Sequence, residues 1–174
     1  LASLSFGAFD GVDGTVEVLY DFGSDVGGFQ FEVSGLALTG GSGGAAGNYG
    51  LDVQTGGPTV LGFSFTGASV PAGNGVLTVL SFSDVTSETT TISMGTFGAI
   101  TDSDGSVFDA SASGSLSHAG QEDCSGDYYG DAVVDNCGTC DSDTSNDCTQ
   151  DCTGVWGGTA AIDECGQCNG DVDY

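Results

Sequence analysis

The phenylalanine and cysteine residues of this chain occupy separate parts of the sequence. All ten Phe lie at or before Phe108, and all seven Cys lie at or after Cys124. An apolar core can form only where large apolar side chains occur, whereas a segment without them needs covalent cross-links to hold a fold. The sequence therefore predicts a core-forming domain, residues 1–118, and a cysteine-rich tail, residues 119–174, with the small polar run Ser111–Gly120 as the linker.

Apolar and polar residues alternate with a period of two along several short runs of the first domain. Such runs begin at Val16, Phe29 and Leu61, whereas Val76–Phe82 is apolar on both faces, as in a central strand. Turn signals such as Asp13-Gly14 separate the runs. Further strands are expected near Leu4–Phe9, Gly50–Gln54, Thr90–Ile100 and Ser106–Ala112. Eight or nine short strands without an amphipathic helix predict an all-β fold, a two-sheet sandwich.

The tail contains an internal repeat. Residues 123–143 read DCSGDYYGDAVVDNCGTCDSD, and residues 151–171 read DCTGVWGGTAAIDECGQCNGD, an ungapped match at an offset of 28 residues. A period of this length indicates small units arranged in series. The tail is therefore expected to be loop-dominated and built from two such repeats, the second one truncated.

The cysteines of the repeats are expected to form disulfides, because units with little apolar core need cross-links. The residues concerned are Cys124, Cys137, Cys140, Cys148, Cys152, Cys165 and Cys168. Four cysteines allow three pairings, and the sequence does not choose among them. The alternative is a zinc site at the two C-x-x-C pairs. Adding 28 to Cys148 gives position 176, so the natural polypeptide is expected to continue past Tyr174, where the missing cysteine would lie.

The charge of the chain excludes several classes of partner. The sequence has 25 Asp and Glu and no Lys or Arg, which gives a formal net charge of -25. Nucleic-acid binding needs Lys or Arg to displace counterions, and anionic membranes repel a chain of this charge. No stretch approaches the length of apolar sequence that spans a membrane, so membrane insertion is not expected.

The excess of Asp over Glu is typical of calcium-loaded secreted proteins, because Asp oxygens on tight turns are calcium ligands. Two stretches of the tail place acids and amides at alternate positions, which predicts at least one structural calcium site. The candidate ligands are Asp141, Asp143, Asn146, Asp147, Asn169, Asp171 and Asp173. The alternative role for the acids is a solvated surface that keeps the chain soluble in salty water. Asp102-Ser-Asp104-Gly105 is interpreted as a hairpin turn rather than a cation site.

Nothing in the sequence indicates an enzyme. His118 is the only His, so a catalytic Ser-His-Asp or Cys-His arrangement would have to use this one residue. We interpret His118 as a solvated linker residue. Paired carboxylates for glycoside hydrolysis would need a walled cleft that a small sandwich rarely builds. Tyr128 and Trp156 occupy matching positions of the two repeats and are expected to fill the small core of each.

Two segments of the first domain resemble cohesin-like modules of secreted bacterial proteins. These are Val26–Val33, with its GFQF strand, and Val70–Phe82, with its PAG turn before a core strand. The resemblance implies a nine-stranded jelly-roll sandwich, and cohesins proper bind dockerin modules through a sheet face. The tail resembles Cys- and Gly-rich repeats of large surface proteins of aquatic bacteria. It is loosely similar to calcium-binding thrombospondin type-3 repeats, although it lacks their regular acidic run.

These features favour an extracellular or cell-surface structural or adhesive subunit of a filament. Such a subunit would polymerise with copies of itself, head to tail, by adding an N-terminal strand to a neighbour's sheet. The residues expected to form that assembly strand are Leu1, Leu4, Phe6 and Phe9. The alternative is a module that recognises a carbohydrate or a partner protein within a large surface protein.

Overall fold

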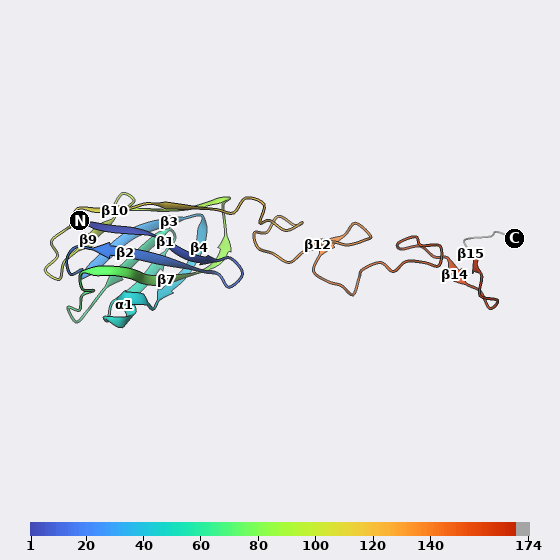
Figure 1. The fold of residues 1–174 in the computed structure, drawn as a ribbon, viewed down its shortest axis with the longest axis horizontal. Coiled ribbons are helices and arrows are strands. Elements are labelled where there is room, and N and C mark those ends of the chain that lie inside the picture. The colour runs from blue at the N-terminus through green and yellow to red at the C-terminus, as the bar shows by residue number, and fades with distance from the viewer. Residues whose placement is uncertain (170–174) are drawn as a thin grey trace. The chain divides into compact units, whose positions relative to one another are not determined.

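The computed structural model describes residues 1–169. The chain divides into two compact units, Leu1–Gln121 and Glu122–Tyr174. Strands β1 to β11 and the short helix α1 (Gly44–Asn48) belong to the first unit, and strands β12 to β15 belong to the second (Figure 1).

The first unit contains two sheets. The strands of one sheet follow the order β10-β1-β2-β7-β4. Their bounds are β1 (Ala2–Asp10), β2 (Thr15–Phe22), β4 (Leu36–Ser42), β7 (Gly73–Val85) and β10 (Ala110–Ala112). The other sheet follows the order β11-β8-β3-β6-β5, and β9 also pairs with β3. Its bounds are β3 (Gly28–Ser34), β5 (Asp52–Gly56), β6 (Thr59–Phe63), β8 (Thr89–Ser93), β9 (Ala99–Thr101) and β11 (Gly114–Ser117).

The core lies between the inner faces of the two sheets. Val16, Val18 and Leu80 of the first sheet are fully buried, as are Phe31 and Val33 of the second. Each follows the period of two along its strand, so that one face of β2, β3 and the middle of β7 is buried. Fully burying a side chain of this size stabilises the fold by about 1.5–3 kcal/mol. The predicted all-β sandwich with a disulfide-rich tail is confirmed.

The two ends of the first unit meet in one sheet. Strand β1 pairs in parallel with β10 over three residues, from Ala2 opposite Ala110 to Leu4 opposite Ala112. The chain then leaves this sheet, because β11 pairs with β8 in the other one. The segment Ser111–Gly120, predicted as a linker, is therefore largely part of the sandwich. It was missed as strand because its residues are small and polar.

His118 corrects a further prediction. It is 1 % exposed, not solvated, and its Nε2 lies 2.9 Å from the Thr90 hydroxyl. Its ring packs against the ring of Phe9, with centroids 4.9 Å apart. Burial lowers the pKa of His118 below its ordinary value, because the charged form loses solvation. A lone His in a polar segment gives no sequence signal for this position.

The second unit consists of two short hairpins. One pairs β12 (Val133–Val134) with β13 (Cys140–Asp141), and the other pairs β14 (Ala161–Ile162) with β15 (Cys168–Asn169). Within the described part of the chain, no side chain beyond His118 is fully buried. Trp156 is 45 % exposed, so the prediction that it fills the core of its repeat is wrong. Burial of large apolar side chains therefore does not stabilise the described part of the repeats.

Candidate functional site

The outer face of the second sheet exposes large apolar side chains. Strand β6 turns Val60 and Gly62 inward, so Leu61 and Phe63 point away from the core. Leu61 is 39 % exposed, and Phe65, in the loop after β6, is 87 % exposed. The strand predicted from the alternation at Leu61 is confirmed, but Leu61 and Phe63, which gave that alternation, face away from the core. A group of exposed apolar side chains on one face marks a candidate interaction site.

A hollow of about 410 Å³ opens on this face where β3, β6 and β9 lie side by side. Gly28 of β3, opposite Thr101 of β9, leaves part of the lining without a side chain. Leu61 and Phe63 line the hollow, together with Phe97 from the loop between β8 and β9. Phe97 is 78 % exposed, so most of its ring is available to a ligand.

Polar groups lie among these apolar residues. The Gln30 side chain lines the hollow, and its Nε2 donates a hydrogen bond to the carbonyl oxygen of Phe97 at 3.2 Å, which ties that loop to β3. Asp102 also lines the hollow, and its Oδ1 accepts the backbone N–H groups of Asp104 and Ser106 at 2.9 and 2.8 Å. These bonds confirm the turn predicted at residues 102–105. A concave site of apolar rings with a few placed polar groups is typical of small-ligand binding.

The predicted assembly strand lies inside the first sheet of its own chain. Ala2 and Leu4 are each 2 % exposed, whereas Leu1 is 84 % exposed and Phe6 and Phe9 are partly buried. Along one side, β1 pairs with β2 from Ala2 to Asp10, with a bulge between Phe6 and Phe9. The bulge is held by Glu17, whose Oε2 accepts the N–H of Ala8 at 3.1 Å.

On its other side, β1 pairs with another strand only at its beginning, although Gly114 lies close to Phe6 further along. Strand β10 pairs with Ala2, Ser3 and Leu4, and the N–H of Ser113 donates to the carbonyl oxygen of Leu4 at 3.1 Å. Beyond Leu4, no described strand pairs with this side of β1. An open strand edge is a template for another strand.

Three disulfides cross-link the tail. Cys124 bonds to Cys140, Cys152 bonds to Cys168 in the same places of the second repeat, and Cys137 bonds to Cys148. Their Cα atoms are 5.9, 5.5 and 5.6 Å apart, within the ordinary range for disulfides. Each closed loop of this length stabilises the fold by about 3 kcal/mol.

These pairings contradict the zinc alternative. The two cysteines of the first C-x-x-C pair, Cys137 and Cys140, belong to different disulfides, and Cys168 of the second pair is also bonded. Cys165, which matches Cys137, is a free and exposed thiol. Disulfides form in oxidising compartments, so they indicate an extracellular protein. Among the described residues, no helix is long and apolar enough to cross a membrane.

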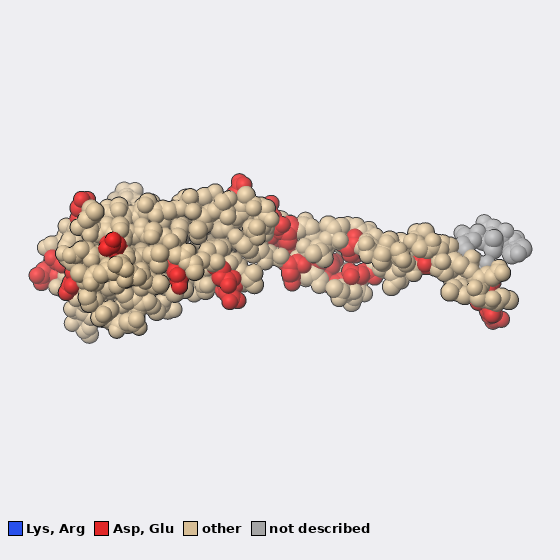
Figure 2. Space-filling model, viewed as in Figure 1, with Lys and Arg blue, Asp and Glu red and all other residues tan. Residues whose placement is uncertain are grey.

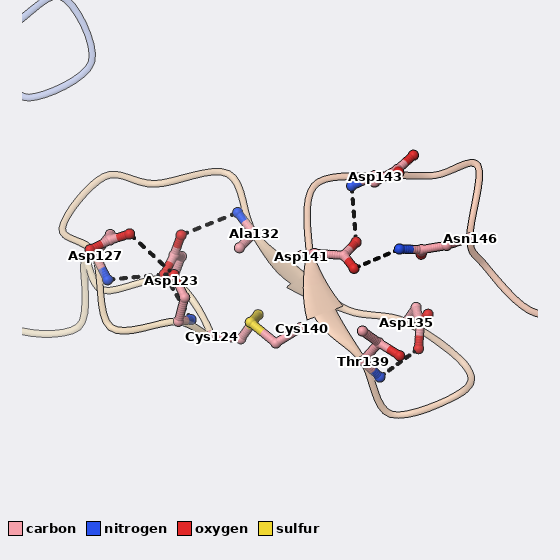
Figure 3. The surroundings of a disulfide bond; sticks show 11 residues. Asp123, Cys124, Asp127, Ala132, Asp135, Thr139, Cys140, Asp141, Asp143 and Asn146 are labelled. Atoms are coloured by element: carbon pink, nitrogen blue, oxygen red, sulfur yellow. Dashed lines mark hydrogen bonds between the residues drawn. A yellow bond between two sulfur atoms is a disulfide. The ribbon is translucent and has the colours of Figure 1, made fainter.

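In each repeat, an aspartate side chain holds the loops together by accepting several hydrogen bonds. The Oδ1 atom of Asp123 accepts the backbone N–H groups of Ser125 and Asp127 and the Ser125 hydroxyl, and its Oδ2 accepts the N–H of Ala132 at 3.2 Å (Figure 3). The hydroxyl of Ser125, followed by these backbone donors, lowers the pKa of Asp123 to about 2. Asp151 repeats the arrangement with Thr153, Val155 and Ala160, and its pKa is also lowered.

The predicted calcium ligands are held in turns of the same kind. Asp141 accepts the N–H of Asp143 at 2.9 Å and the amide of Asn146 at 2.8 Å (Figure 3). Asp143 accepts the N–H and the hydroxyl of Ser145. Asp147 is exposed. Asp171 and Asp173 lie outside the described residues, as does the side chain of Asn169. In the described part of the chain, no three acidic, His or Cys side chains form a group that could hold a metal ion. Calcium binding stays a prediction.

The acidic residues are spread over the surface of each unit. Figure 2 shows Asp and Glu side chains scattered between uncharged ones. Because the sequence contains no Lys or Arg, no carboxylate can pair with a side-chain cation of those types. Solvent, backbone donors and dissolved cations must balance this charge.

Sequence reasoning missed the residues that line the hollow, among them Gly28, Gln30 and Phe97. Phe97 was included in the strand expected near Thr90–Ile100, but β8 ends at Ser93 and β9 begins at Ala99, so Phe97 lies in the loop between them. The sequence signal for this site was the single-residue alternation at Leu61 and Phe63, whose direction relative to the core cannot be read from the pattern alone.

Comparisons with known proteins give similarity only at the level of structure. No protein-family model matches the chain, and no curated protein matches it significantly. A non-cellulosomal cohesin from the archaeon Archaeoglobus fulgidus is similar, with a TM-score of 0.47 and 20% identity over 67% of this chain and 89% of that one. The sixth cohesin of scaffoldin B from Acetivibrio cellulolyticus, in complex with a Cel5 dockerin, has a TM-score of 0.46 and 17% identity over 67% of this chain and 97% of that one. At these levels the likeness carries no conclusion about function.

Proposed function

We propose that this chain is a non-catalytic extracellular subunit that assembles with copies of itself through strand β1, within a bacterial surface filament. The observation that carries the proposal is that, among the described residues, no strand pairs with the β10 side of β1 beyond Leu4. A strand from a neighbouring copy can add there, or β1 can exchange between copies and make in trans the contacts it makes in its own sheet. Exchange costs little, because Ala2 and Leu4 fill the same core positions in either arrangement.

A disulfide lock on β1 tests the exchange version. Ser3 of β1 pairs with Asp21 of β2, and neither residue is buried. A Ser3→Cys, Asp21→Cys variant should hold β1 in its own sheet, since paired residues of this kind lie within disulfide reach. Both substitutions are made with Cys165→Ser, which removes the free thiol. The locked protein is expected to stay monomeric by light scattering and electron microscopy, whereas the two single-cysteine variants, which cannot form the lock and keep the tail disulfides, are expected to form filaments.

A matched lock in the other sheet provides the control. The hydroxyls of Ser34 and Thr91 lie 2.7 Å apart on neighbouring strands, far in sequence from β1. A Ser34→Cys, Thr91→Cys variant should therefore assemble as the unlocked chain does. Filaments from the oxidised β1-locked protein would exclude the exchange version and leave addition of a neighbour's strand beside β1. An unlocked chain that stays monomeric at high salt would exclude this function altogether.

Calcium stiffening of the tail is a further part of the proposal. It rests on the clustered oxygens of Asp141, Asp143 and Asn146 and on a net charge that attracts divalent cations. The melting temperature of the tail, residues 119–174, can be compared in calcium chloride and sodium chloride of equal ionic strength. A higher melting temperature with calcium, lost in an Asp141→Asn variant, is expected. Equal curves in the two salts would count against specific calcium binding.

Recognition of a ligand is a second candidate function. It is favoured by the exposed Leu61 and Phe97 around the hollow on the second sheet. The resemblance of the sequence to cohesin-like modules, which bind through a sheet face, points the same way. Binding of any ligand that depends on Phe97 would support it, and a Phe97→Ala variant that keeps every interaction of the parent chain would oppose it.

A further inference from the structure

The hollow on the second sheet has the size and lining of a site for a small ligand. Its volume of about 410 Å³ falls in the lower part of the range for small-molecule pockets. The lining alternates between the rings of Phe63 and Phe97 and the polar side chains of Gln30 and Thr101. A ligand that fills it must therefore offer both apolar surface and closely spaced hydrogen-bonding groups.

A sugar ring has that combination. Its C–H face packs on an aromatic ring, and its hydroxyls form hydrogen bonds at the ring edge. Phe97 is exposed enough to serve as the platform. The Gln30 amide offers four hydrogen-bonding positions, of which the bond to the Phe97 carbonyl uses one. Both side-chain hydrogen bonds of Asp102 end on Oδ1, and among the described residues no hydrogen bond reaches Oδ2.

The charge of the chain selects among sugars. With no Lys or Arg available, the site has no side-chain cation for a uronic acid, a sialic acid or a sulfated sugar. A protonated amino sugar, in contrast, can place its ammonium group near the Asp102 carboxylate or over the Phe97 ring. A neutral sugar is also compatible.

We infer that the hollow lined by Gly28, Gln30, Phe63, Phe97 and Asp102 binds a neutral or amino sugar residue of a glycan. This deepens the second candidate function and does not depend on filament assembly. An apolar side chain of a protein partner is a weaker fit, because it would leave Gln30 and Asp102 without partners for their hydrogen-bonding groups.

Isothermal titration calorimetry of the whole chain against defined oligosaccharides tests the inference. The probes are oligomers of glucose, N-acetylglucosamine, glucosamine and, as the anionic comparison, galacturonic acid. We expect binding of one or more of the first three and none of the galacturonate. Phe97→Ala should weaken binding about fivefold to tenfold, the range expected for losing one stacking contact. Tyr49→Ala is the control, because Tyr49 is also an exposed aromatic residue and does not line the hollow.

A second variant tests the shape of the site without removing an aromatic ring. A Cβ added at Gly28 would lie 3.2 Å from the Thr101 hydroxyl, so alanine fits with a small adjustment and narrows the hollow. Gly28→Ala is expected to weaken sugar binding while the melting temperature is kept, since alanine suits a strand at least as well as glycine.

Three outcomes would overturn the sugar assignment. They are no binding of any probe at millimolar concentration, equal binding of the galacturonate oligomer, and binding unchanged by both Phe97→Ala and Gly28→Ala. Selection of Phe97-dependent apolar peptides from a displayed library, with no sugar bound, would also overturn it. That last result would leave ligand recognition as a function of the chain and exclude only sugar as the ligand. Failure of the sugar assignment can therefore be told apart from failure of the recognition function.

Discussion

At the scale of single residues, the tail depends on carboxylates that accept several backbone hydrogen bonds. Asp123 illustrates this, because one oxygen serves a turn and the other reaches the N–H of Ala132, nine residues away. An Asp123→Asn substitution keeps one acceptor oxygen but sets an NH₂ group against that N–H. Hydrogen exchange at Ala132 should then become about tenfold faster, as expected when one hydrogen bond is lost. The amide of Ala160, bound in the same way to Asp151, is the internal control and should not change.

The same carboxylates set the acid limit of the tail. The pKa of Asp123 is lowered to about 2, and the pKa values of Asp143 and Asp151 are lowered as well. Between about pH 4 and pH 2 the unfolded chain binds protons that the folded chain does not, so the free energy of unfolding decreases as the pH falls. Exchange protection in the tail should persist at pH 4 and disappear near pH 2. Protection that is lost in one step above pH 4 would contradict this account.

His118 contributes to the pH dependence of the sandwich in the same direction, over a higher range of pH. Its pKa is lowered by burial, so it is neutral in the folded chain, whereas in the unfolded chain it takes up a proton near its ordinary value of 6.5. The free energy of unfolding should therefore decrease as the pH falls below about 6.5, over a range in which ordinary carboxylates change little. Urea unfolding at pH 7.5 and pH 5.5 measures the difference. A His118→Gln variant should lose this pH dependence even if its stability is lower overall.

At the scale of elements, the seam between β3 and β6 depends on a glycine. Gly62 lies opposite Phe29, and a Cβ at Gly62 would overlap the Phe29 ring, which is 2 % exposed. Gly62→Ala should reduce the free energy of unfolding by about 1–3 kcal/mol, the ordinary cost of overpacking a core. Gly56→Ala on the adjacent strand β5 is the control, because a Cβ there meets nothing within 4 Å. Equal stability of the two variants in urea would show that Phe29 can move freely.

Strands could be predicted from the sequence where apolar side chains alternate toward the core. Strands that are held by pairing with a neighbour rather than by their own apolar residues were missed. Strands β2 and β3 follow the pattern that begins at Val16 and Phe29, so they were found from period alone. Strand β11 was missed, because its partner β8 and the buried His118 hold it rather than its own apolar residues. The disulfide pairing could not be chosen, since spacing leaves the three connectivities open until the hairpins bring specific cysteines together.

The candidate site was less predictable than the fold. The hollow collects residues from β3, β6, β9 and the loops beside them, which lie far apart in sequence. Only the three-dimensional pairing of these strands places Gly28 beside Thr101 and brings the carbonyl oxygen of Phe97 to the side-chain amide of Gln30. The assembly strand, in contrast, could be proposed from its apolar residues alone, although its pairing with β10 could not.

At the scale of the whole molecule, unbalanced negative charge opposes both folding and self-association. A net charge of -25 without Lys or Arg means that folding brings carboxylates closer with no side-chain ion pair of those types to offset the repulsion. Raising ionic strength from about 0.01 M to about 1 M shortens the Debye length from about 30 Å to about 3 Å. The melting temperature should therefore rise steadily with sodium chloride, and assembly of copies should begin only when repulsion between them is screened.

Neutralising exposed acids tests whether charge is the cause. Asp13, Asp84 and Asp104 are exposed and lie in different parts of the sandwich. A variant carrying Asp13→Asn, Asp84→Asn and Asp104→Asn should melt at a higher temperature than the parent at low salt and at nearly the same temperature at about 1 M salt, because screening removes the repulsion in both. Its onset of assembly, followed by light scattering, should shift to lower salt. If the parent and the variant differ by the same amount at every salt concentration, the substitutions act through local structure, and repulsion does not limit this fold or its assembly.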